Sequence, residues 1–256
     1  MTDAPLVTRV RHETRRRLLT VASVTRLAPS MVRVVLRGAE LDGFISLGFD
    51  DHVKLFFPGQ LGLGAEPEMR DFTPRHFDAG TGELWIDFFL HESGPAAAWA
   101  ALAAPGQTLS IGGPRGSFIL PLEGIDSHVL IGDETALPAI GRRLEELPAD
   151  ARAIVVVETG ADAQAYPLSS RAPLQVEWVL RPPESAPNAG PLIDVLRTMP
   201  FEPGSWFTWI AAETHVAREI RRYLTSDRSL DKRRVKAAGY WRRGAVATHE
   251  RISDEE

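Results

Sequence analysis

The segment Arg70–His76, RDFTPRH, places a cation, an aromatic ring and a hydroxyl within four residues. Arginine can bind a phosphate through two parallel hydrogen bonds, and an aromatic ring can stack on a flat heterocycle. In a strand, Arg70 and Phe72 share one face, and Asp71 and Thr73 share the other. This pattern matches a flavin dinucleotide, with the pyrophosphate at Arg70, the flavin ring at Phe72 and the Thr73 hydroxyl at a ring nitrogen. The alternative is an ordinary barrel strand with one surface arginine.

The segment His91–Gln107 is expected to begin a helix at Pro95, because proline is favoured in the first helical turn. Backbone N–H groups at such a start could bind the same pyrophosphate. Helix starts are common, so this signal is weak alone. Trp99 and Leu102 are expected in the core.

The segment Gly112–Ser117, GGPRGS, resembles a phosphate-binding loop, but a helix does not follow it, so it is not a dinucleotide fingerprint. Its glycines indicate a backbone that a ligand or a partner domain approaches closely. Gly113, Gly116 and Ser117 are therefore candidate cofactor contacts, with Arg115 as a further polar contact. A purely structural role for the loop is equally open.

The segment Leu130–Ile140, LIGDETALPAI, reads as a strand that turns into a helix. Asp133 or Thr135 could simply cap that helix. A dinucleotide resting on the helix start is the functional alternative, in which Thr135 and the backbone suit a pyrophosphate better than the two carboxylates of Asp133 and Glu134.

Several classes of protein are poorly supported. Cysteine is absent, which excludes disulfides, thiol catalysis and cysteine-ligated metals and fits a reducing cytoplasm. The seven histidines show no metal-binding spacing, and there is no Gly-x-Ser-x-Gly elbow. A net charge of −5 argues against nucleic acid as a partner, and no apolar run is long enough for stable membrane insertion. The run Arg15–Arg17 is expected to be a solvated entry to the first strand.

The organisation of the chain predicts two domains. Six short segments rich in β-branched residues, separated by turn signals, indicate an antiparallel six-stranded β-barrel over residues 15–122. From 128 to 256 apolar strands alternate with helical patterns, which indicates a Rossmann-like, mostly parallel α/β domain. Two such domains could each hold one cofactor.

Six motifs occur in the order typical of one family: RDFT, HESGPAAAWA, GGPRGS, GDETALPAI, AAETHVAREIRRYL and GYWRRG. From about Leu18 to Gly244, the chain resembles the siderophore-interacting proteins, a branch of the ferredoxin–NADP reductase-like flavoproteins. The resemblance implies an FAD-binding barrel, a nicotinamide-nucleotide domain and the reduction of ferric siderophores.

The resemblance also implies roles for individual residues. Arg70 would hold the FAD pyrophosphate, Phe72 would stack on the flavin, and Thr73 would serve catalysis by bonding near the reactive nitrogen. The other implied contacts are, for the FAD phosphates, His91, Gly94, Pro95 and Ala96; for the nicotinamide nucleotide, Asp133, Glu134, Thr135 and Glu213; and for the flavin side, Tyr240 and Trp241. Three departures from the family are Phe72 for the usual Tyr, Glu92 for a common Gly, and Ala212 for a frequent Gly.

The sequence leaves the electron donor open between NADPH, NADH and reduced ferredoxin. Glu158, at the end of a predicted strand, favours a ribose hydroxyl and hence NADH, whereas Arg181 could serve the phosphate of NADPH. The family resemblance tips the expectation toward NADPH. A flavin must stand between donor and iron, because nicotinamide gives two electrons and Fe(III) accepts one.

Anionic ferric siderophores should be attracted by local cations, for which Lys54, Arg242 and Arg243 are candidates; solubilising surface charges are the alternative. A cytoplasmic monomer is expected. Two other functions stay open: a flavin and NAD(P)H reductase with another acceptor, such as free flavin, a quinone or a protein, and a siderophore- or flavin-binding protein without turnover.

Overall fold

The computed structural model describes residues 7–58, 67–91, 94–182, 184–201, 206–245 and 250–252. The chain divides into two compact units. The first consists of Val7–Leu120 together with Ala165–Pro167, and the second is built from the remaining residues after Leu120. Glu92, one of the departures noted above, lies outside the described residues.

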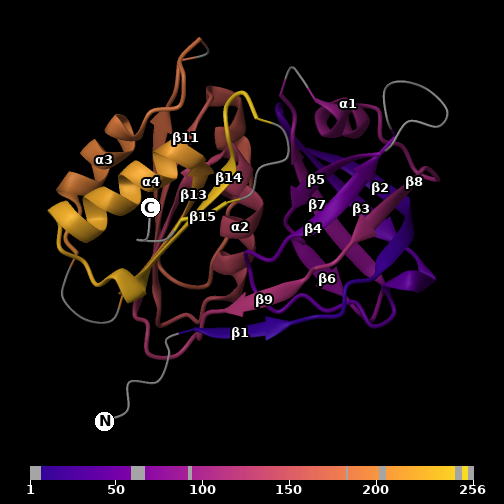
Figure 1. Cartoon of the computed structure of the whole chain (residues 1–256), viewed down its shortest axis with the longest axis horizontal. Helices are drawn as coiled ribbons and strands as arrows, with labels where there is room; N and C mark the ends of the chain where they lie inside the picture. Colours follow the sequence, from indigo (N-terminus) through magenta and orange to yellow (C-terminus); the bar gives the residue numbers. More distant parts are fainter. Residues whose placement is uncertain are drawn as a thin grey trace. The chain divides into compact units, whose positions relative to one another are not determined.

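Short antiparallel strands make up most of the first unit (Figure 1). Its described strands are β1 (Thr8–Arg11), β2 (Arg16–Ala28), β3 (Met31–Arg37), β4 (Val53–Phe57), β5 (Glu68–Phe72), β6 (His76–Asp78), β7 (Glu83–Phe89), β8 (Thr108–Gly112) and β9 (Gly116–Ile119). Seven of these form one curled sheet in the order β5-β4-β8-β2-β3-β7-β6, and β1 pairs with β9 in a separate ribbon. The antiparallel barrel-type architecture is thus confirmed.

The predicted count of six strands is wrong for the described residues, which form nine. β6 has only three residues, too few to give a period-two pattern. β1, with the sequence TRVR, carries two arginines and shows no apolar face. Such segments become strands through their partners and not through their own composition.

The core of the first unit follows from alternation along its strands. In β2, Leu19 and Val21 are buried while Leu18 and Thr20 are exposed. The short helix α1 (Pro95–Ala101) packs onto this core, and Trp99 is half-buried against it. Leu102 is 78% exposed, so its predicted core position is wrong. It follows the last helical turn, where the apolar face ends. A 3-10 turn, η1 (Ala39–Leu41), lies between β3 and β4.

A buried polar network in the first unit includes a residue from far along the chain. Asp87 of β7 accepts two hydrogen bonds of 2.7 Å from Arg33 and one of 2.6 Å from the hydroxyl of Tyr166. Arg75 donates to the same hydroxyl at 3.3 Å. Tyr166 belongs to the short insertion Ala165–Pro167, which clusters with the first unit although its neighbours belong to the second.

The second unit is an α/β sheet with helices on both faces (Figure 1). Its strands are β10 (Ser127–Asp133), β11 (Arg152–Thr159), β12 (Leu174–Leu180), β13 (Trp206–Glu213), β14 (Val235–Trp241) and β15 (Glu250–Ile252). Its helices and helical turns are η2 (Glu134–Ala136), α2 (Leu137–Glu146), η3 (Ala161–Ala165), α3 (Ala189–Thr198), α4 (Thr214–Arg222), the π-helical turn η4 (Tyr223–Asp227) and η5 (Lys232–Arg234). The predicted Rossmann-like class is confirmed.

The strand order in this sheet is β12-β11-β10-β13-β14-β15, parallel except for the last pairing. The chain first adds β11 and β12 on one side of β10, and then β13 and β14 on the other. Strand order therefore reverses between β10 and β13, and ligands of such sheets bind beyond the carboxyl ends of the strands at this point.

The apolar runs of β10 and β11 explain why this sheet is covered on both faces. Val129, Ile131 and Ile210 pack with α3 and α4 in one cluster, and α2 lies on the opposite face (Figure 1). Among the described residues, no helix combines the length and the apolar character needed to cross a membrane.

Candidate functional site

Arg70 and Phe72 face the inside of the curled sheet. They lie opposite Leu55 and Val53 of β4, both fully buried, so the prediction that they share one face is confirmed. The Phe72 ring is half-buried and packs against Phe88 with centroids 4.6 Å apart. Its remaining surface is available for stacking with a flat ring.

Thr73, the next residue, is only 7% exposed. Its hydroxyl is not one of the fully buried polar atoms that lack a hydrogen-bond partner, so burial alone does not demand a ligand there. A threonine hydroxyl can donate a hydrogen bond. Its place next to Phe72 in the chain suits a bond to the ring nitrogen of a flavin.

Arg70, His91 and Gly94 lie close together. The pKa of His91 is lowered by burial and by the positive charge of Arg70. A side-chain carbon built on Gly94 would lie 3.3 Å from Cε1 of His91, and Gly94 has a φ of +112°, which favours glycine. The Arg70 guanidinium donates to Glu68 at 3.0 Å and is half-buried. An anionic pyrophosphate would be attracted to this group, beside which Pro95 and Ala96 begin α1.

Lys54, predicted to bind substrate, is already ion-paired. Its Nζ donates to both carboxylate oxygens of Asp71 at 2.9 Å, across the β4–β5 pairing. Lys54 and Asp71 thus lie on the face opposite to Arg70 and Phe72. The other two predicted substrate contacts, Arg242 and Arg243, are exposed and belong to the second unit.

In the loop GGPRGS the close approach expected at the glycines comes from β1. A side-chain carbon on Gly116 would lie 2.4 Å from the carbonyl oxygen of Val10, its neighbour in the ribbon. Gly113 has a φ of +92°. These two glycines are therefore explained by the fold of the first unit.

The Ser117 hydroxyl in the same loop has three partners. It donates to Asp51 at 2.6 Å, accepts from the backbone N–H of Leu47 at 3.1 Å, and lies 2.8 Å from Nε2 of His12. This network ties β9 to the chain before β4. A cofactor contact at Ser117 would require the exchange of one of these bonds.

Arg17 corrects the expectation of a solvated charge run. Its side chain is buried and donates to four backbone carbonyls, those of Arg15, Glu40, Gly43 and Gly113. Alternation places it on the same face of β2 as Leu19, where no water can satisfy the guanidinium. Arg15 and Arg16 are exposed, as predicted.

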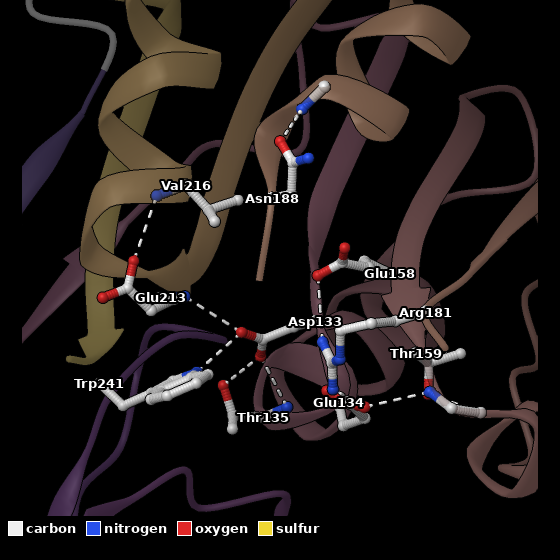
Figure 2. A network of polar contacts seen from close by, with 12 residues as sticks. Asp133, Glu134, Thr135, Glu158, Thr159, Arg181, Asn188, Glu213, Val216 and Trp241 are labelled. Atoms are coloured by element: carbon white, nitrogen blue, oxygen red, sulfur yellow. Dashed lines mark hydrogen bonds and ion pairs between the residues drawn. The ribbon is translucent and has the colours of Figure 1, made fainter. Parts of the chain in front are cut away.

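Asp133 is the centre of a polar network at the strand ends of the second unit (Figure 2). It is 2% exposed and accepts from the N–H of Thr135 at 2.9 Å and its hydroxyl at 2.5 Å. Its other oxygen accepts from the N–H of Glu213 at 3.1 Å and the indole N–H of Trp241 at 2.8 Å. Asp133 thus caps the 3-10 turn η2 that leads into α2, whereas within the described part of the chain α2 itself has no side-chain cap. The same carboxylate joins the ends of β10, β13 and β14.

Glu213 is buried and caps α4. Its Oε2 accepts from the backbone N–H groups of His215 at 2.7 Å and Val216 at 3.3 Å, and its Oε1 accepts from the N–H of Arg243 at 3.3 Å. Tyr240 and Trp241 end β14 and are half-buried. The residues predicted around the nucleotide thus meet at the point where strand order reverses.

Arg181 bridges two further carboxylates in this network, as Figure 2 shows. It donates to Glu134 at 2.5 Å and to Glu158 at 3.0 Å. Burial raises the pKa of both carboxyls, and the neighbouring charge of Asp133 raises that of Glu134 further. The sequence analysis named Glu158 and Arg181 as separate candidates. Their ion pair could not be predicted from local sequence, because the two residues lie 23 positions apart.

The described residues include no group of three or more histidine or acidic side chains arranged to hold a metal ion. The first unit instead offers an aromatic ring that can stack on a ligand, with a hydroxyl and a cation near it in the chain. The second unit offers a polar network at the ends of its strands.

Comparison with known proteins identifies both units. Residues 125–244 match the family model "Siderophore-interacting protein", and residues 20–63 and 61–118 match "Siderophore-interacting FAD-binding domain". The NADPH-dependent ferric-chelate reductase of Escherichia coli (strain K12) is 38% identical, with 91% of this chain and 95% of that protein covered.

Two further relatives agree. Ferric vibriobactin reductase ViuB of Vibrio cholerae serotype O1 is 29% identical, with 94% of this chain and 96% of that protein covered. A crystal structure of a siderophore utilization protein from T. fusca superposes with a TM-score of 0.86 at 36% identity, covering 94% of this chain and 98% of that one. The matches span nearly the whole sequence, and the chain belongs to the siderophore-interacting protein family.

Proposed function

We propose that this protein is an FAD-dependent reductase that passes electrons from NADPH to the iron of a ferric siderophore. The observation that carries the proposal is that relatives covering nine-tenths or more of the chain are named NADPH-dependent ferric-chelate reductase and ferric vibriobactin reductase. We assign FAD to a domain over 15–122 and the nicotinamide nucleotide to a domain over 128–256.

In the FAD domain, Arg70 binds the pyrophosphate, Phe72 stacks on the flavin ring and Thr73 donates a hydrogen bond to it. His91, Gly94, Pro95 and Ala96 line the phosphates. The partly exposed ring of Phe72 and the position of Thr73 next to it in the chain support this assignment. Gly113 and Gly116 contact the cofactor only through their backbone. Ser117 contacts it by exchanging one of the hydrogen bonds of its hydroxyl.

In the nucleotide domain, Asp133, Glu134, Thr135 and Glu213 surround the nicotinamide nucleotide at the reversal of strand order. Tyr240 and Trp241, at the end of β14, are further proposed cofactor contacts. When bound, FAD accepts an electron pair from the nicotinamide and releases the electrons singly. The iron step needs no acid or base from the chain, so positioning is the task of these residues. Reduction of the iron in the substrate weakens its hold on hard oxygen ligands and favours release.

Cations attract the anionic substrate. Arg242 and Arg243 are exposed. The Lys54 ammonium binds the substrate only after its ion pair with Asp71 breaks. Because each exposed cation contributes modestly, their joint effect should depend on ionic strength. A cytoplasmic location and a monomeric state complete the proposal.

An anaerobic visible absorption spectrum before and after NADPH tests it. Flavin bands that bleach, followed by their return with release of Fe(II) when a ferric siderophore is added, are the expected result. Bleaching without any Fe(II) from ferric siderophores, but with reduction of a quinone, would replace this acceptor with another. A protein that takes up no FAD would contradict the reductase assignment.

A further inference from the structure

Arg181 stands at the carboxyl end of β12, between carboxylates from two other elements. Its two terminal nitrogens donate to Glu134 and Glu158, whose side chains are 4% and 5% exposed. Arg181 itself is 17% exposed, so one edge of the guanidinium reaches solvent. Figure 2 shows it directly between the two acidic groups.

The charges in this network are unequal. Asp133, Glu134 and Glu158 are the carboxyls that act on one another here, and Arg181 is the cation that acts on all three. The backbone N–H of Gly160 bonds Glu134, and a backbone hydrogen bond from Asn188 reaches Glu158. A buried carboxylate that loses its cation must find another partner or take up a proton.

The position of this ion-pair bridge matches the part of a doubly wound sheet that reads the adenosine ribose. An acidic residue at the end of the second strand accepts the ribose 2′-hydroxyl in such sheets, and a nearby arginine accommodates a 2′-phosphate. Glu158 is the last residue but one of β11, the strand that follows β10, and Arg181 directly follows β12, which pairs with β11. The two groups have opposite preferences for the donor, and they neutralise one another.

We propose that Arg181 selects NADPH by exchanging Glu158 for the 2′-phosphate, and that the carboxylate left behind takes up one proton from solvent. The inference rests on the proposed nicotinamide-nucleotide site. One guanidinium–carboxylate pair breaks, one guanidinium–phosphate pair forms and one carboxylate is protonated; no electron moves.

The exchange makes recognition of the 2′-phosphate depend on pH. Binding coupled to proton uptake weakens as the pH rises, by at most about tenfold for each pH unit. Above pH ~7 a phosphate monoester is already mostly doubly ionised, so a slope there comes from the protein. A nucleotide without the 2′-phosphate leaves the pair intact and shows no such slope.

Calorimetric titration of the full chain with 2′,5′-ADP and with 5′-AMP, at pH 7, 8 and 9, tests the exchange without any turnover. These probes differ only in the 2′-phosphate. We expect 2′,5′-ADP to bind more tightly than 5′-AMP at pH 7, with a net uptake of protons that 5′-AMP does not show, measured in buffers of different ionisation heat. Glu158→Gln should bind 2′,5′-ADP about tenfold more tightly at pH 8, with a smaller slope, because no full ion pair has to break.

Arg181 is removed together with the charge of Glu158, so that the net charge of the network does not change. The double variant Arg181→Leu with Glu158→Gln should bind the two probes equally. Arg197→Leu is the control, because Arg197 forms an exposed ion pair with Asp194 on α3. A preference that survives loss of Arg181, or a wild-type affinity independent of pH, overturns the exchange. Failure of both probes to bind the wild type overturns the nucleotide site itself.

Discussion

The indole N–H of Trp241 donates a 2.8 Å hydrogen bond to Oδ2 of Asp133, and this bond joins the last residue of β14 to the last residue of β10. The same oxygen accepts from the N–H of Glu213 at the end of β13. A single buried carboxylate thus fixes the relative positions of three strand ends, at the edge of the sheet proposed to bind the nucleotide.

Trp241→Phe should therefore destabilise the protein. The substitution keeps an aromatic ring but leaves a lone pair of a fully buried carboxylate without its donor, which costs about 1–3 kcal/mol. Chemical denaturation followed by circular dichroism measures the loss. Trp178→Phe is the matched control, since Trp178 is half-buried on β12. Equal midpoints for the two variants would show that the Asp133 bond contributes nothing.

Arg70→Ala should lose FAD. A charge-assisted hydrogen bond contributes about 1.5–3 kcal/mol, so the dissociation constant should rise roughly 10- to 150-fold. Flavin-to-protein absorbance ratios of the purified variants measure retention. Arg15→Ala removes an exposed arginine from the same unit as a control. Equal FAD occupancy in the two variants would remove Arg70 from the pyrophosphate site.

The pKa of His91 should rise when FAD binds. It is lowered by burial and by the charge of Arg70, and an anionic pyrophosphate would neutralise that charge. Histidine resonances followed by NMR across pH 5–8, with and without FAD, measure the change. In the flavin-free protein, Arg70→Ala should raise the same pKa. If FAD leaves the pKa of His91 unchanged, the phosphates bind elsewhere. The resonances of His76, which is exposed on β6, serve as the internal reference.

His128 should weaken the fold in acid. It is fully buried on β10, neither ring nitrogen has a hydrogen-bond partner among the described residues, and burial lowers its pKa to about 3. In the unfolded chain His128 takes up a proton near the ordinary histidine pKa of 6.5, whereas in the folded chain it does so only near 3. Stability from this group is full above pH ~6.5 and falls by roughly 1 kcal/mol per pH unit below it.

His128→Leu should flatten this part of the stability profile. Urea denaturation at pH 7, 6 and 5 measures the slope for wild type and variant. His215→Leu, at an exposed position on α4, should keep the wild-type slope. A His128→Leu slope as steep as that of the wild type would assign the acid sensitivity to other groups.

Local pattern was sufficient for much of the fold. The parallel strands are continuous apolar runs because helices cover both faces, and such runs are visible in the sequence. β1 and β9 were missed because their pairing partners, not their composition, make them strands.

The candidate site divides in the same way. Alternation on one strand predicts that Arg70 and Phe72 share a face. The burial of Arg17 was not predictable, since its carbonyl partners come from loops up to 96 residues away. Asp133 bonds residues 80 and 108 positions distant, so only the folded sheet shows it as the centre of a network.

The insertion Ala165–Pro167 makes the first unit discontinuous in the chain. A fragment that ends at Leu120 contains Asp87 and Arg33 but lacks the Tyr166 hydroxyl that bonds this buried carboxylate. The fragment would lose one of the three hydrogen bonds described for this carboxylate, and Arg75 would lose the hydroxyl to which it donates. An exchange of the second unit for another would therefore have to keep Tyr166 or replace the hydrogen bonds that its hydroxyl makes.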